Sequence, residues 1–217
     1  MKVAIFGAGT MGSGIAQVFA ANGHTALLYA TSVESAQRHK DKLAASLNKR
    51  VLKGKMTQEA ADDLLSRILV EEVAAAADAD LVIECVAENM AVKKELLQRL
   101  DTLCKEETVF ATNTSSLSIT EMGKGLMHQM VGMHFFNPVP AMKLLEIVEG
   151  LCTSKETIAS LKTMGESWGK VCIVSKDTGG FIANRIGSMA ITAAVNAVAD
   201  FGYTVAKADA LTGDLIF

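Results

Sequence analysis

The stretch VAIFGAGTMG, residues 3–12, places a GxGxxG motif directly after a short apolar run. The run is typical of a buried parallel strand, and residues 11–22 continue with the apolar spacing of a helix. Because strand, glycine turn and helix occur together, the stretch predicts a dinucleotide-binding α/β fold more strongly than the motif alone would. Its glycines also argue against a signal peptide, which an apolar N-terminus could otherwise suggest.

Each position of the motif has a separate role in holding a dinucleotide. Gly7 permits the tight turn, Gly9 lets a pyrophosphate approach the backbone, and Gly12 allows the helix to pack closely on the strand. Thr10 and Met11 begin the helix, whose free N–H groups can bind the phosphates. We therefore expect these five residues to form the cofactor-binding turn.

Strand patterns alternate with helical ones along most of the chain. A long polar stretch, residues 32–67, is interrupted at Gly54 and restarts at the N-cap Thr57, which predicts a helical hairpin longer than an ordinary crossover. The alternation predicts an α/β fold with a Rossmann-type, doubly wound, mostly parallel sheet and this hairpin as an insertion. The expected strands are residues 3–6, 26–29, 81–85, 109–112, 131–134, 144–147 and 171–174.

Two more helices are expected outside the hairpin. One follows the N-cap Asn89, and its apolar residues repeat at helical spacing on one face: Val92, Leu96, Leu100 and Leu103. The other runs from Gly180 to about Phe201, and Gly202 is its expected stop. We therefore divide the chain into a dinucleotide-binding domain with the catalytic residues, residues 1–178, and the start of an all-α domain, residues 179–217.

Composition bounds the possible functions. Of the 217 residues, 50% are hydrophobic and 21% are charged, which predicts a compact globular protein. A net charge of −3 gives no general attraction to nucleic acid or anionic lipid. The four cysteines form no CxxC pair, so we expect neither a metal site nor a disulfide framework. No stretch is long and apolar enough for a bilayer, and we expect a soluble, cytoplasmic protein.

One expected feature of the dinucleotide site is missing. A carboxylate normally stands at the end of the second strand, where it binds the ribose hydroxyls. This sequence has Ala30 there, followed by Thr31 and Ser32. We therefore expect NAD as the cofactor with weakened discrimination against NADP, whose 2′-phosphate meets no acid at position 30. No arginine follows the strand directly, so a full switch to NADP is not expected.

Two polar segments follow strands at the edge where such sheets bind ligands: NTSSLS, residues 113–118, and GMHFFNPVP, residues 132–140. In the second segment, His134 can act as a general acid or base near neutral pH. Glu146 stands on the next strand, and a chain reversal between them would bring its carboxylate beside the imidazole. Ser115 supplies a hydroxyl that could share a substrate proton. The other histidines have no such context and are expected at the surface: His24, His39 and His128.

Four runs of the sequence closely resemble the 3-hydroxyacyl-CoA dehydrogenase family, including its 3-hydroxybutyryl-CoA enzymes: AENMAVKK, TNTSSLSI, MHFFNPVPAMKLLEIVEG and KDTGGFIANRI. The resemblance covers essentially the whole chain, and HFFNPVP followed by KLLEI is its most specific part. It implies an oxidoreductase that oxidises 3-hydroxyacyl-CoA reversibly to 3-oxoacyl-CoA with NAD, as in fatty-acid β-oxidation and butyrate metabolism.

The resemblance also implies roles for individual residues in the reaction. His134 would be the catalytic base, and Glu146 would be its orienting partner. Ser115 and Asn184 would bind the reacting oxygens of the substrate.

Cofactor and coenzyme A contacts follow from the same resemblance. Glu88, Lys93 and Asn137, together with Ser115, would contact or position the nicotinamide end of the cofactor. On the helical hairpin, Arg50 and Lys53, with Lys55 nearby, would hold the phosphates of coenzyme A. The acyl-CoA substrate is thus the expected small-molecule partner.

The sequence departs from the family at three places. Ala30 replaces the usual Asp, Gly179 replaces the usual Pro, and the chain stops at Phe217 where the family continues for several helices. We therefore expect a chain truncated in its C-terminal helical domain. Because that domain would cover the apolar side of the helix after Gly180, we expect a homo-oligomer formed through this helix and turnover below that of longer relatives.

Two other functions are alternatives. One is a related β-hydroxyacid dehydrogenase acting on a small free acid, although such enzymes generally use a catalytic lysine. The other is a catalytically silent dinucleotide-binding protein, which the alanine at position 30 favours. The intact set of Ser115, His134, Glu146 and Asn184 argues against the silent protein.

Overall fold

The computed structural model describes residues 1–215 of the chain. The strands in this part are β1 (Lys2–Phe6), β2 (Thr25–Tyr29), β3 (Ile68–Leu69), β4 (Leu81–Glu84), β5 (Val109–Thr112), β6 (Met130–Phe135), β7 (Leu144–Glu149) and β8 (Val171–Lys176). The helices are α1 (Thr10–Ala21), α2 (Val33–Leu52), α3 (Gln58–Ser66), the 3₁₀ turn η1 (Val73–Ala76), α4 (Met90–Asp101), α5 (Ile119–Gly123), α6 (Lys155–Ser167), α7 (Ala183–Phe201) and α8 (Val205–Leu215).

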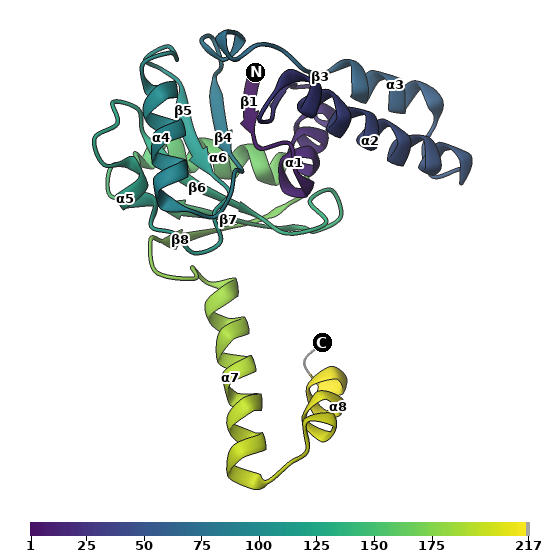
Figure 1. Cartoon of the computed structure of the whole chain (residues 1–217), viewed down its shortest axis with the longest axis vertical. Helices are drawn as coiled ribbons and strands as arrows, with labels where there is room; N and C mark the ends of the chain where they lie inside the picture. The colour runs from purple at the N-terminus through teal and green to yellow at the C-terminus, as the bar shows by residue number, and fades with distance from the viewer. Residues whose placement is uncertain (216–217) are drawn as a thin grey trace.

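The strands form one sheet in the order β3-β2-β1-β4-β5-β6-β7-β8 (Figure 1). The strands from β1 to β6 are parallel, whereas β7 runs antiparallel to β6 and pairs in parallel with β8. The winding changes direction at β1, which has β2 on one side and β4 on the other. Ligands of such sheets bind outside the carboxyl ends of the strands at this switch. The prediction of a Rossmann-type, doubly wound, mostly parallel sheet is confirmed.

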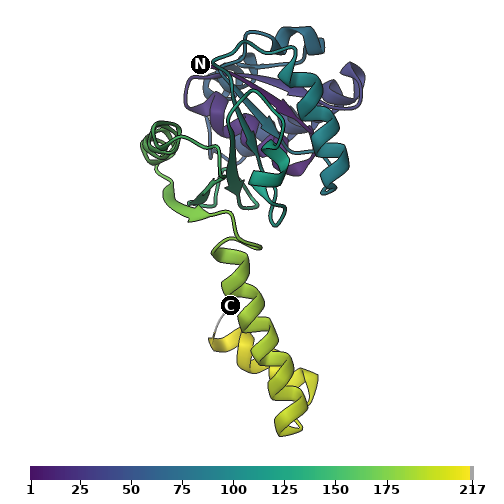
Figure 2. The ribbon, with the colours of Figure 1, turned by 90° about the vertical axis from the view of Figure 1, so that its left-hand side faces the viewer.

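Helices cover both faces of the sheet, as the positions of α6 and α4 on its two sides show (Figure 2). Strand β1 illustrates why, since its side chains alternate between two apolar cores. Val3 and Ile5 pack into the core under α1 and α6, and Ala4 and Phe6 pack into the core under α4 and α5. A strand that is apolar on both faces is typical of a buried parallel sheet.

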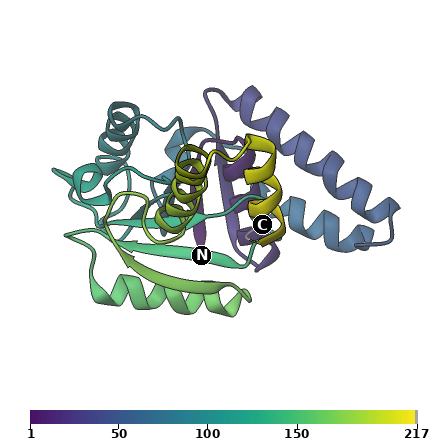
Figure 3. The same cartoon turned by 90° about the horizontal axis from the view of Figure 1, so that it is seen from below.

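The predicted hairpin consists of α2 and α3 and projects to one side of the sheet (Figure 3). Ser32 and Thr57 cap the two helices through their side-chain oxygens, which accept hydrogen bonds from backbone N–H groups of the first turn. Gly54 has a φ of 64° in the turn between the helices, a conformation that favours glycine. The sequence therefore located both the break and the second cap.

Helix α7 leaves the sheet, and α8 folds back beside it (Figures 1 and 2). As predicted, α7 ends at Gly202, which adopts the left-handed conformation with a φ of 62°. None of the residues of α7 is buried. No helix in the described residues is long and apolar enough to cross a membrane. Residues 216 and 217 of the second expected domain lie outside the described part.

The predicted buried face of α4 is confirmed at Leu100, which is buried, and at Leu96 and Leu103, which pack against the same core, but it is wrong at Val92. Val92 is 45% exposed, while Lys93, Leu97 and Leu100 face the sheet. The physical reason is a buried acid below the helix, Glu84, which draws the Lys93 ammonium inward. The sequence patterns also left out β3, η1, α6 and α8, the first because two residues are too few to carry a periodicity.

Candidate active site

The glycine turn between β1 and α1 has the geometry that its motif requires. Gly7 has a φ of 110°, and a Cβ there would lie 2.3 Å from the carbonyl oxygen of Cys85. A Cβ on Gly12 would lie 1.9 Å from the carbonyl oxygen of Gly7. At Gly9, by contrast, nothing lies within 4 Å of the same position, and no side chain caps α1. The turn therefore leaves space and free N–H groups that fit a pyrophosphate.

His134 and Glu146 form a buried pair at the end of β6. They are direct partners in the antiparallel register of β6 and β7, and His134 Nδ1 lies 2.6 Å from Glu146 Oε2. His134 is 3% exposed and Glu146 is 0% exposed. Since a carboxylate can only accept, Nδ1 carries the proton and Nε2 of the neutral ring is a free base. Within the described residues, Nε2 makes no hydrogen bond of its own, so it can take or return a proton.

The second carboxylate oxygen of Glu146 holds the start of α7. Glu146 Oε1 accepts hydrogen bonds from the backbone N–H groups of Ile182, at 3.0 Å, and Ala183, at 2.8 Å. Just before them, Phe181 is buried with a positive φ of 49°, which is rare for a residue with a side chain. Its ring packs 5.7 Å from the His134 ring. One carboxylate thus links the imidazole to the helix that carries Asn184.

The loop after β5 brings Ser115 to the same edge. The Asn184 side-chain amide donates to the carbonyl oxygen of Ser115 at 3.0 Å, and the Ser115 N–H donates to Glu88 Oε1 at 3.1 Å. Asn113 Oδ1 accepts from the backbone N–H of Phe135 at 2.8 Å, which ties the loop to the strand of His134. The structure therefore brings Ser115, Asn184 and the His134 strand together.

Glu88 is kept ionised by its neighbours. Burial alone would raise the pKa of Glu88, but hydrogen bonds from Thr114 and Lys93 and the positive charge of Lys93 hold it below its ordinary value. Lys93 Nζ lies 3.1 Å from Glu88 Oε2. The ionised Glu88 carboxylate can therefore fix the Ser115 loop, because Thr114 and the Ser115 N–H donate hydrogen bonds to it.

Lys93 is itself buried beneath this loop. It is 1% exposed, and its ammonium donates to both carboxylate oxygens of Glu84 at 2.8 Å. Thr112 Oγ1 donates to the same carboxylate at 2.7 Å. Because the ammonium is enclosed by two acids, Lys93 acts on its surroundings through Glu88 and not by direct exposure.

A groove of about 420 Å³ lies beside the glycine turn. Its walls are α1, the α2 residues His39, Lys42 and Ser46, and the turn that begins at the exposed Asn137. This groove places Asn137 next to the phosphate-binding turn. It also offers a basic side chain, Lys42, that the sequence patterns did not single out.

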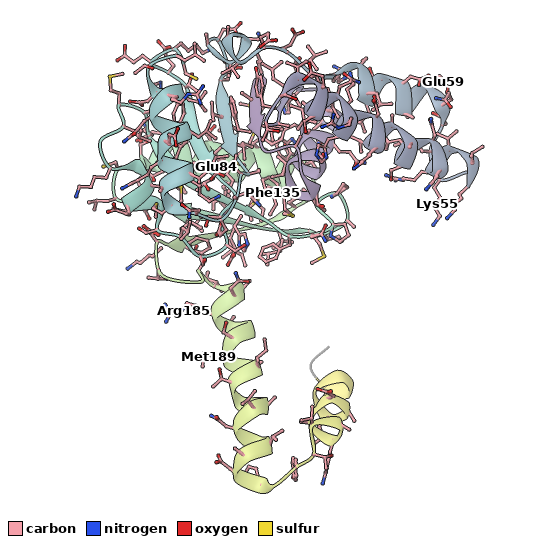
Figure 4. The ribbon with its side chains drawn as sticks, viewed as in Figure 1. Lys55, Glu59, Glu84, Phe135, Arg185 and Met189 are labelled. Carbon is pink, nitrogen blue, oxygen red and sulfur yellow. The ribbon has the colours of Figure 1, made fainter. Side chains whose placement is uncertain are left out.

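Arg50 and Lys53 lie outside this groove but extend its line. Spacings of four residues put Lys42, Ser46 and Arg50 on one face of α2, and Lys53 follows as the C-cap of the helix. Lys55 stands at the far tip of the hairpin, near Glu59 (Figure 4). The face of α2 that lines the groove therefore continues to Arg50, and Lys53 and Lys55 follow in the turn at the end of the hairpin.

The expectation that His128 lies at the surface is wrong. It is 6% exposed, its Nδ1 lies 2.6 Å from Asp101 Oδ1, and its ring stacks on Phe110. Asp101 at the end of α4 and Phe110 on β5 receive it, and neither is close to it in sequence. His24 and His39 are half-buried.

Sequence reasoning missed Glu84 and Phe181. Glu84 had a usable signal, since an acid at the end of the apolar run LVIE of a buried strand needs a partner. Phe181 had none, because its positive φ and its contact with His134 arise only from the fold.

Known proteins share both the sequence and the fold. Residues 2–178 match the family described as 3-hydroxyacyl-CoA dehydrogenase, NAD binding domain. The chain is 45% identical to the 3-hydroxyadipyl-CoA dehydrogenase of Escherichia coli (strain K12), over 85% of this chain and 39% of that protein. It is 41% identical to the 3-hydroxybutyryl-CoA dehydrogenase of Clostridioides difficile, over 92% of this chain and 72% of that protein.

A solved structure shows the same architecture. The crystal structure of (S)-3-hydroxybutyryl-CoA dehydrogenase from Ralstonia eutropha matches 95% of this chain and 74% of its own, with a TM-score of 0.89 and 34% identity. The chain thus spans between 39% and 74% of the length of these three proteins. The matched family, the relatives and the fold agree, and the chain belongs to the 3-hydroxyacyl-CoA dehydrogenase family.

Proposed function

We propose that this chain oxidises a 3-hydroxyacyl-CoA reversibly to a 3-oxoacyl-CoA with NAD. The observation that carries the proposal is the buried His134–Glu146 pair, whose free imidazole nitrogen stands at the sheet edge of the glycine turn. The relatives named for 3-hydroxyadipyl-CoA and 3-hydroxybutyryl-CoA support the substrate class.

In oxidation, His134 Nε2 takes the proton of the substrate 3-hydroxyl, and Glu146 stabilises the imidazolium that forms. NAD, when bound beside Ser115 and Asn137, would supply the acceptor for the hydride that leaves C3. Ser115 and Asn184 hold the reacting oxygens, and their mutual hydrogen bond keeps them in register. In reduction the imidazolium returns its proton to the 3-oxo group. The protein contributes alignment and charge, while the cofactor carries the electrons.

The cofactor contacts divide between two groups of residues. Gly7, Gly9 and Gly12, with the N–H groups of Thr10 and Met11, hold the pyrophosphate. At the nicotinamide end, Glu88 and Asn137 contact the cofactor, together with Ser115. Lys93 positions Glu88 through its ion pair.

The acyl-CoA binds along the groove beside the glycine turn. Lys42 lines the groove, Arg50 continues its basic face along α2, and Lys53 follows at the C-cap of that helix. These three cations are suited to the phosphates of coenzyme A, which the net negative charge of the protein would otherwise repel.

NADH oxidation with acetoacetyl-CoA, compared with free acetoacetate, tests the proposal. We expect turnover with the thioester only. Turnover with the free acid would instead support a small-acid dehydrogenase. NADH binding without turnover of either would support a silent binding protein.

We also propose that α7 mediates self-association. Ile186 and Met189, three residues apart on the same side of α7, are 64% and 72% exposed, and Met189 projects from the helix beyond Arg185 (Figure 4). An exposed apolar stripe of this kind favours a partner. A single monomeric species in sedimentation over a wide concentration range would contradict it.

The division into residues 1–178 and 179–217 and a cytoplasmic location are further proposals. The departure of α7 from the sheet supports the first (Figure 1). Four free cysteines in the described residues, of which Cys152 is exposed, support a reducing compartment.

A further inference from the structure

A small cavity lies at the end of β2, where dinucleotide-binding folds hold the adenosine ribose. Its volume is about 150 Å³, and residues 29–33 form one of its sides. The other side carries two acids, Glu71 and Glu72, from the segment that follows β3. The cavity therefore contains carboxylates although Ala30 stands at the usual position of the acid.

The pairing of β3 with β2 explains why these acids are there. Ala26 pairs with Ile68 and Leu27 with Leu69, and the two strands run parallel. If the pairing of β2 with β3 is extended by two to three residues in the same register, Glu71 falls beside Tyr29 and Glu72 beside Ala30. Both glutamates are exposed, so their carboxylates can meet a ligand.

The charged side chains that line the cavity are all negative. Two of its lining residues are acidic, and none is lysine or arginine. Tyr29 and Glu71 line the same cavity. The pKa of Tyr29 is raised, first by burial and then by the negative charge of Glu71. Tyr29 Oη is buried and has no hydrogen-bond partner within the described residues. A group that donates hydrogen bonds suits this cavity, and a phosphate does not.

We propose that Glu71 and Glu72 take over the role of the acid missing at position 30, binding the adenosine ribose hydroxyls and excluding the 2′-phosphate of NADP. The proposal rests on the proposed function only in requiring a nicotinamide dinucleotide. It replaces the expectation, drawn from Ala30 alone, of weak discrimination between the two cofactors.

The expected size of the effect follows from the chemistry. A hydrogen bond to a charged group changes affinity by about 10- to 100-fold, and a carboxylate beside a 2′-phosphate adds repulsion. We therefore expect the protein to bind NADH at least about 30-fold more tightly than NADPH.

Calorimetric titration with NADH and with NADPH, without acyl-CoA, tests the proposal. The variants are Glu71→Gln, Glu72→Gln and the double variant. Glu106→Gln is the matched control, because this exposed acid lies before the amino end of β5, whereas the cavity lies at the carboxyl end of β2. Since all three glutamates are exposed, their replacement should leave the fold intact, which thermal unfolding checks.

In the double variant, NADH should bind about 10- to 100-fold more weakly and the preference over NADPH should fall below about threefold. The single variants identify the larger contributor, and the control should match wild type. Adding Ala30→Asp to the double variant should restore the preference.

Equal binding of both cofactors by the wild type, or an unchanged preference in the double variant, would overturn the proposal. Failure of the proposed function looks different, because a chain that binds NADH but does not turn over acetoacetyl-CoA leaves these affinities as predicted.

Discussion

Two buried histidine–carboxylate pairs stand at opposite ends of β6, and they differ at one ring nitrogen. In both, Nδ1 lies 2.6 Å from a carboxylate oxygen, of Glu146 for His134 and of Asp101 for His128. His128 Nε2 also lies 2.9 Å from the carbonyl oxygen of Lys105, whereas His134 Nε2 makes no hydrogen bond within the described residues.

The difference separates the proposed base from a structural pair. Both ring nitrogens of His128 lie within hydrogen-bond distance of protein oxygens, so neither is left for a substrate and the ring joins α4, the turn after it and β6. His134 has the same carboxylate support but leaves one nitrogen for a substrate. A carboxylate close to Nδ1 therefore does not by itself distinguish a catalytic histidine. We infer that the distinguishing feature is the Nε2 atom without a hydrogen bond.

Exchange of His134 for Gln should give the largest effect. His134→Gln removes the proposed base, and kcat should fall by about 10²–10⁴-fold while NADH binding stays within a few-fold. Steady-state kinetics with acetoacetyl-CoA and calorimetric titration of NADH measure the two quantities.

The same substitution at the other pair is the matched control. His128→Gln loses one hydrogen bond and the stacking on Phe110, so it should cost about 2 kcal/mol of stability and leave kcat within twofold. A loss of activity in this variant, or near-normal turnover in His134→Gln, would erase the distinction between the pairs.

Glu146→Gln should have the next largest effect on activity. The amide cannot stabilise an imidazolium as a carboxylate does, and it also weakens the bonds to the N–H groups of Ile182 and Ala183. We expect kcat to fall by about 10- to 150-fold, which corresponds to about 1.5–3 kcal/mol. The pH–rate profile is the decisive measurement, since a purely structural Glu146 would lower kcat without moving its acid limb.

Sequence reasoning located what local spacing determines. The glycine turn is contiguous, and His134 and Glu146 lie on neighbouring strands joined by a turn, so the antiparallel register that pairs them could be anticipated. Helix caps such as Thr57 and Asn89 could also be predicted. The side chain of a cap accepts a hydrogen bond from a backbone N–H only two or three residues later.

The rest depends on contacts distant in sequence. Lys93 is buried in an ion pair with Glu84, and no periodicity within α4 reports an acid on another element. Glu71 and Glu72 reach the end of β2 only because the two-residue β3 pairs there. His128 looked like a surface residue since Asp101 stands 27 positions away.

The smallest effect on activity should come from Asp101→Asn, which tests whether the second pair is structural. Burial alone would raise the pKa of Asp101, but hydrogen bonds from the His128 ring and from the N–H groups of Met127 and His128 hold it below its ordinary value. A lowered pKa in the folded state means that the ionised carboxylate stabilises the fold at any pH above the unfolded value of about 3.9. This contribution disappears as the pH falls through the lowered value.

At pH 7, the free energy of unfolding of the variant should therefore be about 2–3 kcal/mol lower than that of wild type, and its Tm should be roughly 5–10 °C lower. The gap should narrow as the pH falls below the unfolded value of about 3.9 and wild type also becomes protonated. Urea unfolding at pH 7 and at successively more acidic pH measures the gap, and kcat at pH 7 should stay within twofold of wild type. A gap that is independent of pH would mean that the charge of Asp101 is not what holds His128, and the contrast between the two pairs would then rest on the free nitrogen of His134 alone.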